Sequence, residues 1–168
     1  MREVRWEGMG DFVSDDFRII YSGGKGGQRG VAVLCDQEVG NRVTKIVPHS
    51  DRLLLVRIKA DPIDIVLLQV YMPTTEAEDQ EIELMYEQIE DLIKKEKATD
   101  QVIIMGDWNA VVGEGREEKE VGEFGLGKRN ERGQALVDFC KRSKMLLSNT
   151  WFEEDIHEKD QVTWEGFN

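Results

Sequence analysis

The sequence predicts a layered α/β fold with mixed β-sheets. Short apolar runs separated by Gly, Asp and Pro dominate residues 1–70, helical periodicity is confined to two segments, and one of those segments falls between two predicted strands. The length of 168 residues fits one domain, and 40% hydrophobic with 33% charged residues is typical of a globular protein. We therefore expect residues 1–168 to form a single domain.

Apolar runs of strand length, bounded by turn residues, indicate the strands that precede the first helix. They lie at Phe17–Ser22, Val31–Cys35, Val43–Val47, Arg52–Lys59 and Ile63–Tyr71. We interpret the glycine-rich residues 23–30 as a flexible hairpin loop between the first two strands. Asp61-Pro62 is the expected turn between the last two, which would form a hairpin.

The clearest helix follows Pro73. Thr75-Glu76-Ala77-Glu78 matches a capping box, in which the threonine hydroxyl accepts a backbone N–H and Glu78 reaches back. One apolar helical stripe follows, formed by Ile82, Met85, Tyr86, Ile89, Leu92 and Ile93. Residues 76–97 contain nine acidic residues and three lysines, which is half of the chain's net charge of −12 and indicates an exposed helix face.

The remainder of the chain predicts fewer elements. Gln101–Met105 has the pattern of a buried strand, and residues 113–132 that of a polar loop. Asn130 is the expected cap of a second helix over Glu131–Lys144. Two further strands are predicted at Met145–Asn149 and, only just beginning, at Val162–Trp164.

Composition excludes several classes of function. No apolar run reaches the roughly 18–20 residues needed to span a bilayer, so we expect no membrane partner. A net charge of −12 argues against non-specific coating of nucleic acid, although the acid concentrated in residues 76–97 leaves room for a phosphate-facing surface elsewhere. Cys35 and Cys140 stand far apart and outside any metal-binding spacing, which suits a reducing compartment, so we expect an intracellular protein, nuclear or cytoplasmic.

Gly106-Asp107-Trp108-Asn109-Ala110 is the sharpest chemical signal. It follows the apolar run 102–105 directly, and loops beyond strand ends are where open sheets place their sites. A carboxylate and an amide two residues apart are able to orient a water molecule and hold a phosphate oxygen. Gly, Asp and Asn are also ordinary turn residues, so a simple β-turn is the alternative interpretation.

Two other segments become informative beside this motif. Tyr71, in Val70-Tyr71-Met72-Pro73, ends another predicted buried strand, where its hydroxyl would donate to a phosphate oxygen. The alternative is a half-buried tyrosine that closes the core. Glu3-Val4-Arg5-Trp6 combines an acid, a base and an aromatic, and taken alone it is an ordinary exposed N-terminus.

Taken together, these segments resemble the endonuclease/exonuclease/phosphatase superfamily, and within it the endonuclease domains of RTE-type non-LTR retrotransposons. The resemblance covers essentially the whole chain. Its motifs, in order, are Glu3-x-Arg5-Trp6-x-Gly8, Gly30-Val31-Ala32-Val33, Val70-Tyr71-Met72-Pro73-Thr74, Gly106-Asp107-Trp108-Asn109-Ala110, Asn130-x-Arg132-Gly133, Asn149-Thr150-Trp151-Phe152 and Thr163-Trp164.

The resemblance implies a DNase I-like fold, which is a four-layer sandwich of two mixed β-sheets flanked by helices, and a metal-dependent phosphodiesterase that cuts DNA. By that resemblance Glu3 would ligate Mg²⁺, or Mn²⁺ in its place, since such hard cations prefer carboxylate oxygens. Tyr71 would contact the scissile phosphate. Asp107 would position and help deprotonate the attacking water, and Asn109 would align the phosphate.

Four further residues are candidate contacts with DNA. Lys25 and Arg29 lie in the glycine-rich loop, where their charges would meet the phosphate backbone. Thr74 stands where apurinic endonucleases have asparagine, which argues against a dedicated abasic-site enzyme. Trp164, like Phe152, either lies beside the DNA or belongs to the core.

The chain also departs from the family pattern at both ends. The family's opening strand, with its asparagine, would precede Met1, and its Ile-Asp-Tyr strand and Ser-Asp-His end would follow Asn168. We therefore expect a truncated domain with an incomplete active site and uncovered sheet edges that favour self-association. The alternative function is that of an inactive relic that serves as a nucleic-acid or protein binding module.

Two glycine-rich segments resemble nucleotide-binding loops but lack essential parts. Residues 122–128 nearly match a P-loop, yet Arg129 stands where Ser or Thr must ligate magnesium, and no buried strand precedes them. Residues 23–30 approach a dinucleotide fingerprint, but the third glycine is out of step and no helix follows. We therefore expect no nucleotide cofactor.

Overall fold

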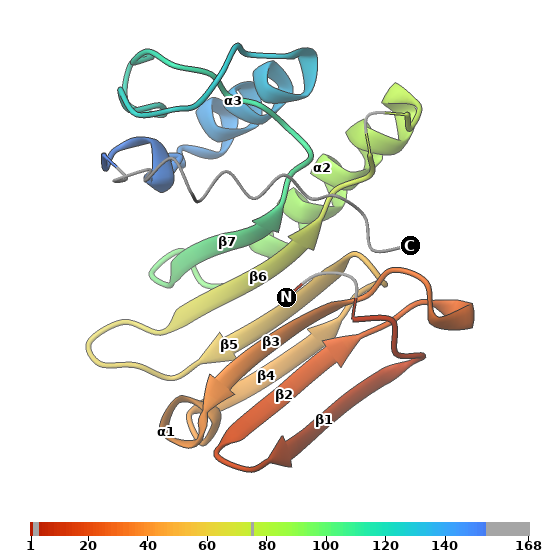
Figure 1. Cartoon of the computed structure of the whole chain (residues 1–168). Helices are drawn as coiled ribbons and strands as arrows, with labels where there is room; N and C mark the ends of the chain where they lie inside the picture. The colour runs from red at the N-terminus through yellow and green to blue at the C-terminus, as the bar shows by residue number, and fades with distance from the viewer. Residues whose placement is uncertain (2–3, 75, 154–168) are drawn as a thin grey trace. The chain divides into compact units, whose positions relative to one another are not determined.

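The computed structural model describes residues 1, 4–74 and 76–153 (Figure 1). The chain divides into two compact units, residues 1–109 and residues 110–168, called here the first and second units. This division does not test the expectation, from length and composition, that residues 1–168 form a single domain, so that expectation stays a prediction. The strand predicted at Val162–Trp164 lies outside the described residues.

The first unit begins with an antiparallel three-stranded sheet. Its strands are β1 (Met9–Ser14), β2 (Phe17–Ser22) and β3 (Val31–Asp36), paired in that order. The predicted strands β2 and β3 are confirmed, whereas β1 was not predicted. The reason is physical: β1 is an edge strand whose side chains are almost all exposed, so it lacks the alternation of apolar and polar residues that identifies a half-buried strand.

A mixed four-stranded sheet follows. Its order is β4 (Val43–Pro48), β5 (Leu53–Ile58), β6 (Ile65–Tyr71) and β7 (Gln101–Asp107), and the short helix α1 (Gln37–Gly40) precedes it. The pairs β4–β5 and β5–β6 are antiparallel, which confirms the predicted hairpin, and β6–β7 is parallel. A parallel pair needs a long crossover, which here contains helix α2 (Asp79–Lys94).

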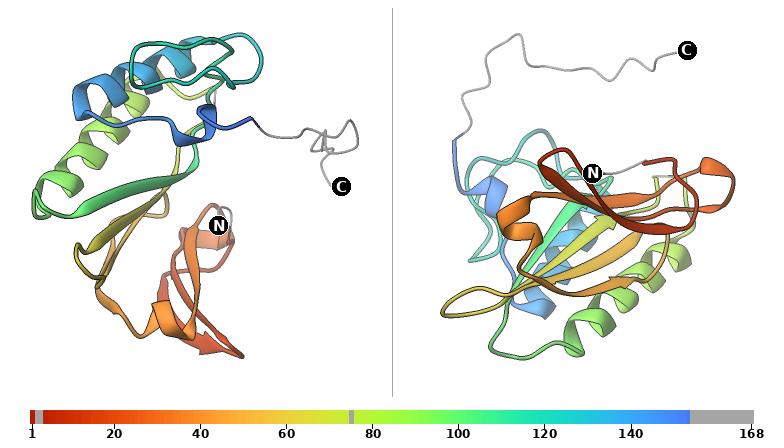
Figure 2. Two further views of the ribbon diagram at one scale, coloured as in Figure 1. Left: turned by 90° about the vertical axis from the view of Figure 1, so that its left-hand side faces the viewer. Right: turned by 90° about the horizontal axis from the view of Figure 1, so that it is seen from below.

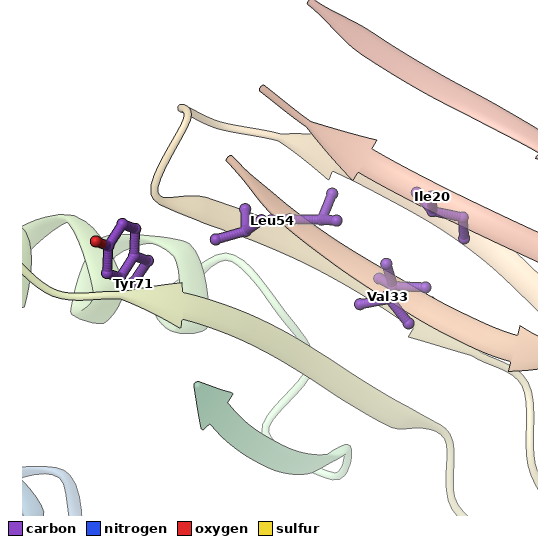
Figure 3. Close-up of a cluster of buried hydrophobic side chains, with 6 residues drawn as sticks. Ile20, Val33, Leu54 and Tyr71 are labelled. Atoms are coloured by element: carbon purple, nitrogen blue, oxygen red, sulfur yellow. The ribbon is translucent and has the colours of Figure 1, made fainter. Parts of the chain in front are cut away.

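The two sheets pack face to face around an apolar core (Figure 3). The buried cluster takes side chains from both sheets, namely Ile20, Val31, Val33, Leu54, Val56 and Tyr71. Strand β5 is buried on both faces, since Leu53 and Leu55, which alternate with the cluster residues, are also fully inaccessible.

Helix α2 covers the opposite face of the four-stranded sheet (Figure 2). The predicted apolar stripe is confirmed, with Ile82, Met85, Tyr86, Ile89 and Leu92 buried. The predicted capping box is wrong. Glu78 is itself the N-cap and makes no capping bond with its side chain. The Ala77 N–H donates to the Thr74 carbonyl (3.0 Å) in a turn that precedes the helix, so the helix begins only at Asp79. Thr75 lies outside the described residues.

Strand β7 is not the buried strand that its apolar sequence predicts. Ile103 and Met105 are 43% and 44% exposed. Strand β7 pairs only with β6 among the described strands, so it is the last strand of the sheet in the part of the chain that the structure describes. Ile103 is the strand partner of Leu67, which packs against the core between the two sheets. Ile103 and Met105 therefore lie on the same face of the sheet as Leu67 but are exposed to solvent.

The second unit contains a long loop, helix α3 (Glu131–Ser143) and a short 3₁₀ turn at Ser148–Thr150. The predicted α3 is confirmed together with its cap: Oδ1 of Asn130 accepts the N–H of Gly133 (2.7 Å). The strand predicted at Met145–Asn149 is wrong, because Leu147 makes only one isolated bridge, with Val121, before the 3₁₀ turn begins. None of the helices in the described ranges is long and apolar enough to cross a membrane.

Candidate functional site

The carboxyl ends of β6 and β7 bring two predicted site residues together. Because these strands are parallel and in register, Tyr71 and Asp107 are paired at the same edge of the sheet. The N–H of Met72 donates to the carbonyl of Asp107 (2.8 Å), which extends the pairing one residue beyond the ladder. The two strand ends therefore place Tyr71 and Asp107 side by side, at the edge of the sheet where the motif predicts a site.

Asn109 is fixed beside this pair by two hydrogen bonds. Its backbone N–H donates to Oδ1 of Asp107 (3.0 Å), and its side-chain Nδ2 donates to the Met72 carbonyl (2.7 Å). The first bond is an Asx turn, and Asn109 has the positive φ of 46° that asparagine tolerates in such turns. The turn and the functional interpretation are thus compatible, since the turn itself orients the carboxylate and the amide.

Gly106 allows the two strands to approach closely here. Its φ is +147°, and a Cβ at this position would lie 1.8 Å from the Val70 carbonyl oxygen. No residue with a side chain fits such a distance. The glycine of the motif therefore has a structural role next to Asp107.

Trp108 connects the motif to helix α2. Its ring stacks on that of Tyr86, with 6.2 Å between ring centroids and 18° between the ring planes. Asp107 and Asn109 are both half-buried on either side of this anchored residue. The Trp108 ring therefore holds the loop against α2 at a point between Asp107 and Asn109.

Tyr71 lies at one end of the core cluster, and its hydroxyl points away from Ile20 and Val33 (Figure 3). It is only 7% exposed, so it belongs to the core and is more deeply buried than the half-buried tyrosine of the alternative interpretation. The guanidinium carbon of Arg52 lies 5.2 Å from the centroid of its ring. Nη1 of Arg52 also donates to the Tyr71 carbonyl (3.2 Å).

Arg52 contacts Tyr71, and the sequence did not reveal this contact. Its side chain is only 12% exposed and lies 3.7 Å from the Glu81 carboxylate. Burial lowers the pKa of its guanidinium, and the nearby charge of Arg29 lowers it further. No sequence signal indicates this contact, because it depends on the pairing of Leu53, the first residue of β5, with Val70, the neighbour of Tyr71.

The glycine-rich loop carries the two predicted basic contacts. Lys25 begins a short 3₁₀ turn, Lys25–Gly27, and Arg29 is half-exposed and lies 3.6 Å from Asp51. The loop that we interpreted as a flexible hairpin is tied to its surroundings, since the Gly30 N–H donates to the Asp51 carbonyl (3.1 Å) and the Gly26 N–H to Glu7 (2.7 Å).

The remaining predicted site residues are not brought together by the described structure. Thr74 is exposed just after the end of β6, and Phe152 is 70% exposed. Glu3 and Trp164 lie outside the described residues.

The glycines of residues 122–128 serve packing: a Cβ at Gly122 would lie 2.2 Å from the Thr150 carbonyl oxygen, and one at Gly125 1.9 Å from that of Gly113.

The donors available for a metal ion at the strand ends are oxygens. Among the residues that the structure describes, no three His, Cys, Asp or Glu side chains gather as a metal site. Asp107 offers a carboxylate, and Mg²⁺ is commonly bound through one or two carboxylates, with water and substrate phosphate completing its shell. A hard divalent cation at this edge would therefore bind through the Asp107 carboxylate, with water and substrate phosphate as its other ligands.

Comparison with solved structures defines the class of fold. The chain resembles the endonuclease domain of TRAS1, a telomere-specific non-LTR retrotransposon, with a TM-score of 0.57 and 18% sequence identity over 77% of this chain and 54% of that one. The two packed sheets with a covering helix are thus a DNase I-like α/β fold, the class expected from the sequence motifs. No family model matches the chain.

Comparison with curated sequences identifies a particular relative. The chain is similar to craniofacial development protein 2, with 37% identity to the protein of Bos taurus and 36% to that of Tragulus javanicus, each over 153 residues and 90% of this chain. It spans about a quarter of the length of these relatives, 26% and 27%.

Proposed function

We propose that this chain is part of a metal-dependent phosphodiesterase of retrotransposon origin whose substrate is DNA. The observation that supports this most directly is the pairing of Tyr71 and Asp107 at adjacent strand ends, with the Asn109 side chain bonded to the segment that follows Tyr71. The nuclease-like fold and the ordered motifs support the same proposal.

In this proposal, water attacks the phosphorus atom of a DNA phosphodiester. A bond forms between the water oxygen and phosphorus while one ester P–O bond breaks, Asp107 takes the proton that the water releases, and the leaving sugar oxygen takes a proton from solvent water. Asn109 aligns a phosphate oxygen, and Tyr71 donates a hydrogen bond to another. Arg52 positions Tyr71 through the ring and carbonyl contacts, so it acts through that residue.

A bound Mg²⁺ or Mn²⁺ would neutralise charge on the phosphate. Asp107 is the described carboxylate at the strand ends, and Glu3 is proposed as the metal ligand by its place in the Glu3-x-Arg5-Trp6 motif. Lys25, Arg29, Thr74 and Trp164 are proposed contacts with the DNA strand.

The test is nicking of supercoiled plasmid in Mg²⁺ by the full chain, beside Asp107→Ala and an EDTA control. Asp91→Ala, an exposed aspartate on α2, is the matched variant. We expect only slow nicking by the parent chain and by Asp91→Ala, in keeping with the incomplete active site expected from the sequence, and its loss both with EDTA and in Asp107→Ala. Removal of one catalytic group typically costs a factor of about 100 or more in rate.

Circular dichroism spectra first establish that each variant is folded. A folded parent chain that nicks no faster than Asp107→Ala overturns the proposed activity. The protein would then retain a nuclease fold without nuclease function.

A further inference from the structure

A network of ion pairs lies at the end of the four-stranded sheet opposite the candidate site. Its centre is Arg57, near the end of β5. Nη2 of Arg57 lies 2.7 Å from the Asp100 carboxylate and 3.2 Å from that of Asp64, and its Nη1 lies 3.0 Å from Glu96. Lys45, on β4, lies 2.5 Å from the second oxygen of the Glu96 carboxylate. We call these residues the charge network, and all of them belong to the first unit.

The carboxylates of the charge network depend on Arg57. The side chain of Glu96 is 3% exposed and that of Asp100 is 4% exposed, while that of Arg57 itself is 13% exposed. A buried charge is strongly unfavourable unless an opposite charge and hydrogen bonds compensate it. A shift of the chain that separates Asp100 from Arg57 is therefore unfavourable.

The charge network joins the starts of two parallel strands. Asp64 directly precedes β6 and Asp100 directly precedes β7, and the N–H of Gln101 donates to the Asp64 carbonyl (2.9 Å). The register that pairs Ile65 with Gln101 thus brings the two aspartates next to each other. Like charges at opposed positions repel. Arg57 replaces this repulsion with attraction, because one nitrogen, Nη2, contacts both carboxylates.

The apolar residues of β6 and β7 do not specify this register by themselves. Each strand contains an unbroken apolar run, residues 65–68 in β6 and residues 102–105 in β7. A shift of two residues keeps every side chain on its own face of the sheet. It would place Leu67 opposite Met105 instead of Ile103, again in apolar contact. The charge network, by contrast, distinguishes the two registers.

The register decides which residues meet at the candidate site. Tyr71 and Asp107 form the last pair of the parallel ladder. A shift of two residues would move Asp107 by about 7 Å along the strand, away from Tyr71. Gly106 favours the native register at this end, through its close approach to Val70. We propose that the charge network selects the native register at the other end of the same strands and so positions Asp107 beside Tyr71. Its effect on catalysis rests on the proposed function.

The test removes the charges without leaving Glu96 or Asp100 as an unpaired buried charge. The neutral variant carries Arg57→Met, Glu96→Gln and Asp100→Asn. Its matched control carries Arg42→Met and Glu38→Gln, which remove an exposed ion pair outside the charge network. Interstrand nuclear Overhauser effects between backbone protons of the isotope-labelled full chain report which residues of β6 and β7 are paired. Thermal unfolding followed by circular dichroism measures the stability of each variant.

We expect the parent chain and the control to show the native pairs alone. The neutral variant should fold with a melting temperature close to that of the parent chain, because the cost of burying the charges disappears together with their attraction. In the neutral variant the native effects between β6 and β7 should lose intensity, and a second set should appear in which Leu67 contacts Met105. A loss of native pairing at unchanged stability separates the selection of register from a general stabilising role.

Two outcomes overturn the proposal. A folded neutral variant that shows the native pairs alone would mean that other contacts select the register. A neutral variant that does not fold would mean that the charge network stabilises the sheet as a whole instead of selecting between registers.

Nicking of plasmid is measured separately. In the neutral variant it should fall with the fraction of molecules in the native register. A parent chain that does not nick contradicts the proposed function and leaves the result on register unchanged.

Discussion

At Gly106 the backbone of β7 passes against the Val70 carbonyl, and this contact can be tested with a single methyl group. We expect Gly106→Ala to lower the free energy of unfolding by about 3–5 kcal/mol, because both the positive φ and the 1.8 Å approach oppose a Cβ. Urea denaturation followed by circular dichroism measures the loss.

Gly26→Ala is the matched control, since Gly26 also has a positive φ, +69°, but no atom lies within 4 Å of the place that the added methyl group would occupy. It should cost only about 1 kcal/mol, the penalty of the backbone conformation alone. Equal losses in the two variants would show that the strands separate easily and that the close approach is not required.

The sequence was sufficient to predict Asp107 and Asn109 as a pair, because they are two residues apart and directly follow an apolar run. It was not sufficient for Arg52. This residue meets Tyr71 only through the register of β5 on β6, and a sequence pattern does not specify a contact that depends on how two strands align. The core position of Tyr71 depends on the facing sheet in the same way.

At the scale of elements, β7 is an edge strand among the described strands, and its side chains Ile103 and Met105 are exposed. Unpaired edge N–H and C=O groups beside apolar side chains favour pairing with another chain. We therefore expect the protein to self-associate as its concentration rises, and we expect Ile103→Lys to reduce this association, since charge on an edge strand blocks pairing. Light scattering after size exclusion at several concentrations measures the mass.

Leu84→Lys provides the comparison, because Leu84 is similarly exposed (52%) but lies on helix α2. It should associate as the parent chain does. A parent chain that stays monomeric over the whole concentration range contradicts the prediction, and the edge of β7 is then protected by other means.

The elements differ in how far the sequence predicts them. The two long helices are clear because the 3.6-residue apolar period and the Asn130 cap are local features. The exposure of β7 is not local, since an apolar strand is buried only when another layer covers it. The segment 145–149 has strand-forming residues, but among the described residues its pairing is limited to one bridge, between Leu147 and Val121. It therefore forms no strand, and a 3₁₀ turn begins at Ser148.

At the scale of the whole molecule, acid stability depends on carboxylates spread along the chain. Hydrogen bonds from Lys141 and Arg129 hold the pKa of Glu117 below its ordinary value of 4.5, and Lys141 Nζ lies 2.6 Å from its carboxylate. The Arg18 guanidinium lowers the pKa of Asp11 in the same way. Asp64 also has a lowered pKa, chiefly because the Ala60 N–H donates to it.

A carboxyl whose pKa is lower in the folded than in the unfolded protein stabilises the fold above the unfolded value, and this stabilisation is lost as pH falls through the folded value. For Glu117 the loss begins near pH 4.5. We therefore expect Glu117→Gln to lower the melting temperature at pH 7 and to flatten its decline below pH 4.5. Because the group is partly exposed, the effect should stay below about 1 kcal/mol.

Glu118→Gln is the control for this measurement, since it removes the same negative charge from an exposed neighbouring residue. A net charge of −12 means that partial protonation relieves repulsion throughout the molecule, and both variants share this effect equally. Melting curves that are the same for the two variants at every pH would contradict a specific role of Glu117.

The parallel pairing of β6 with β7 also has a consequence for folding kinetics. Tyr71 and Asp107 meet only after the intervening segment, helix α2 included, has returned to the sheet, and such non-local pairing forms slowly because loop closure must precede its contacts. The hairpins β1–β2 and β5–β6, by contrast, join neighbouring segments. We therefore expect the pairing that joins Tyr71 and Asp107 to form later in folding than the hairpins β1–β2 and β5–β6.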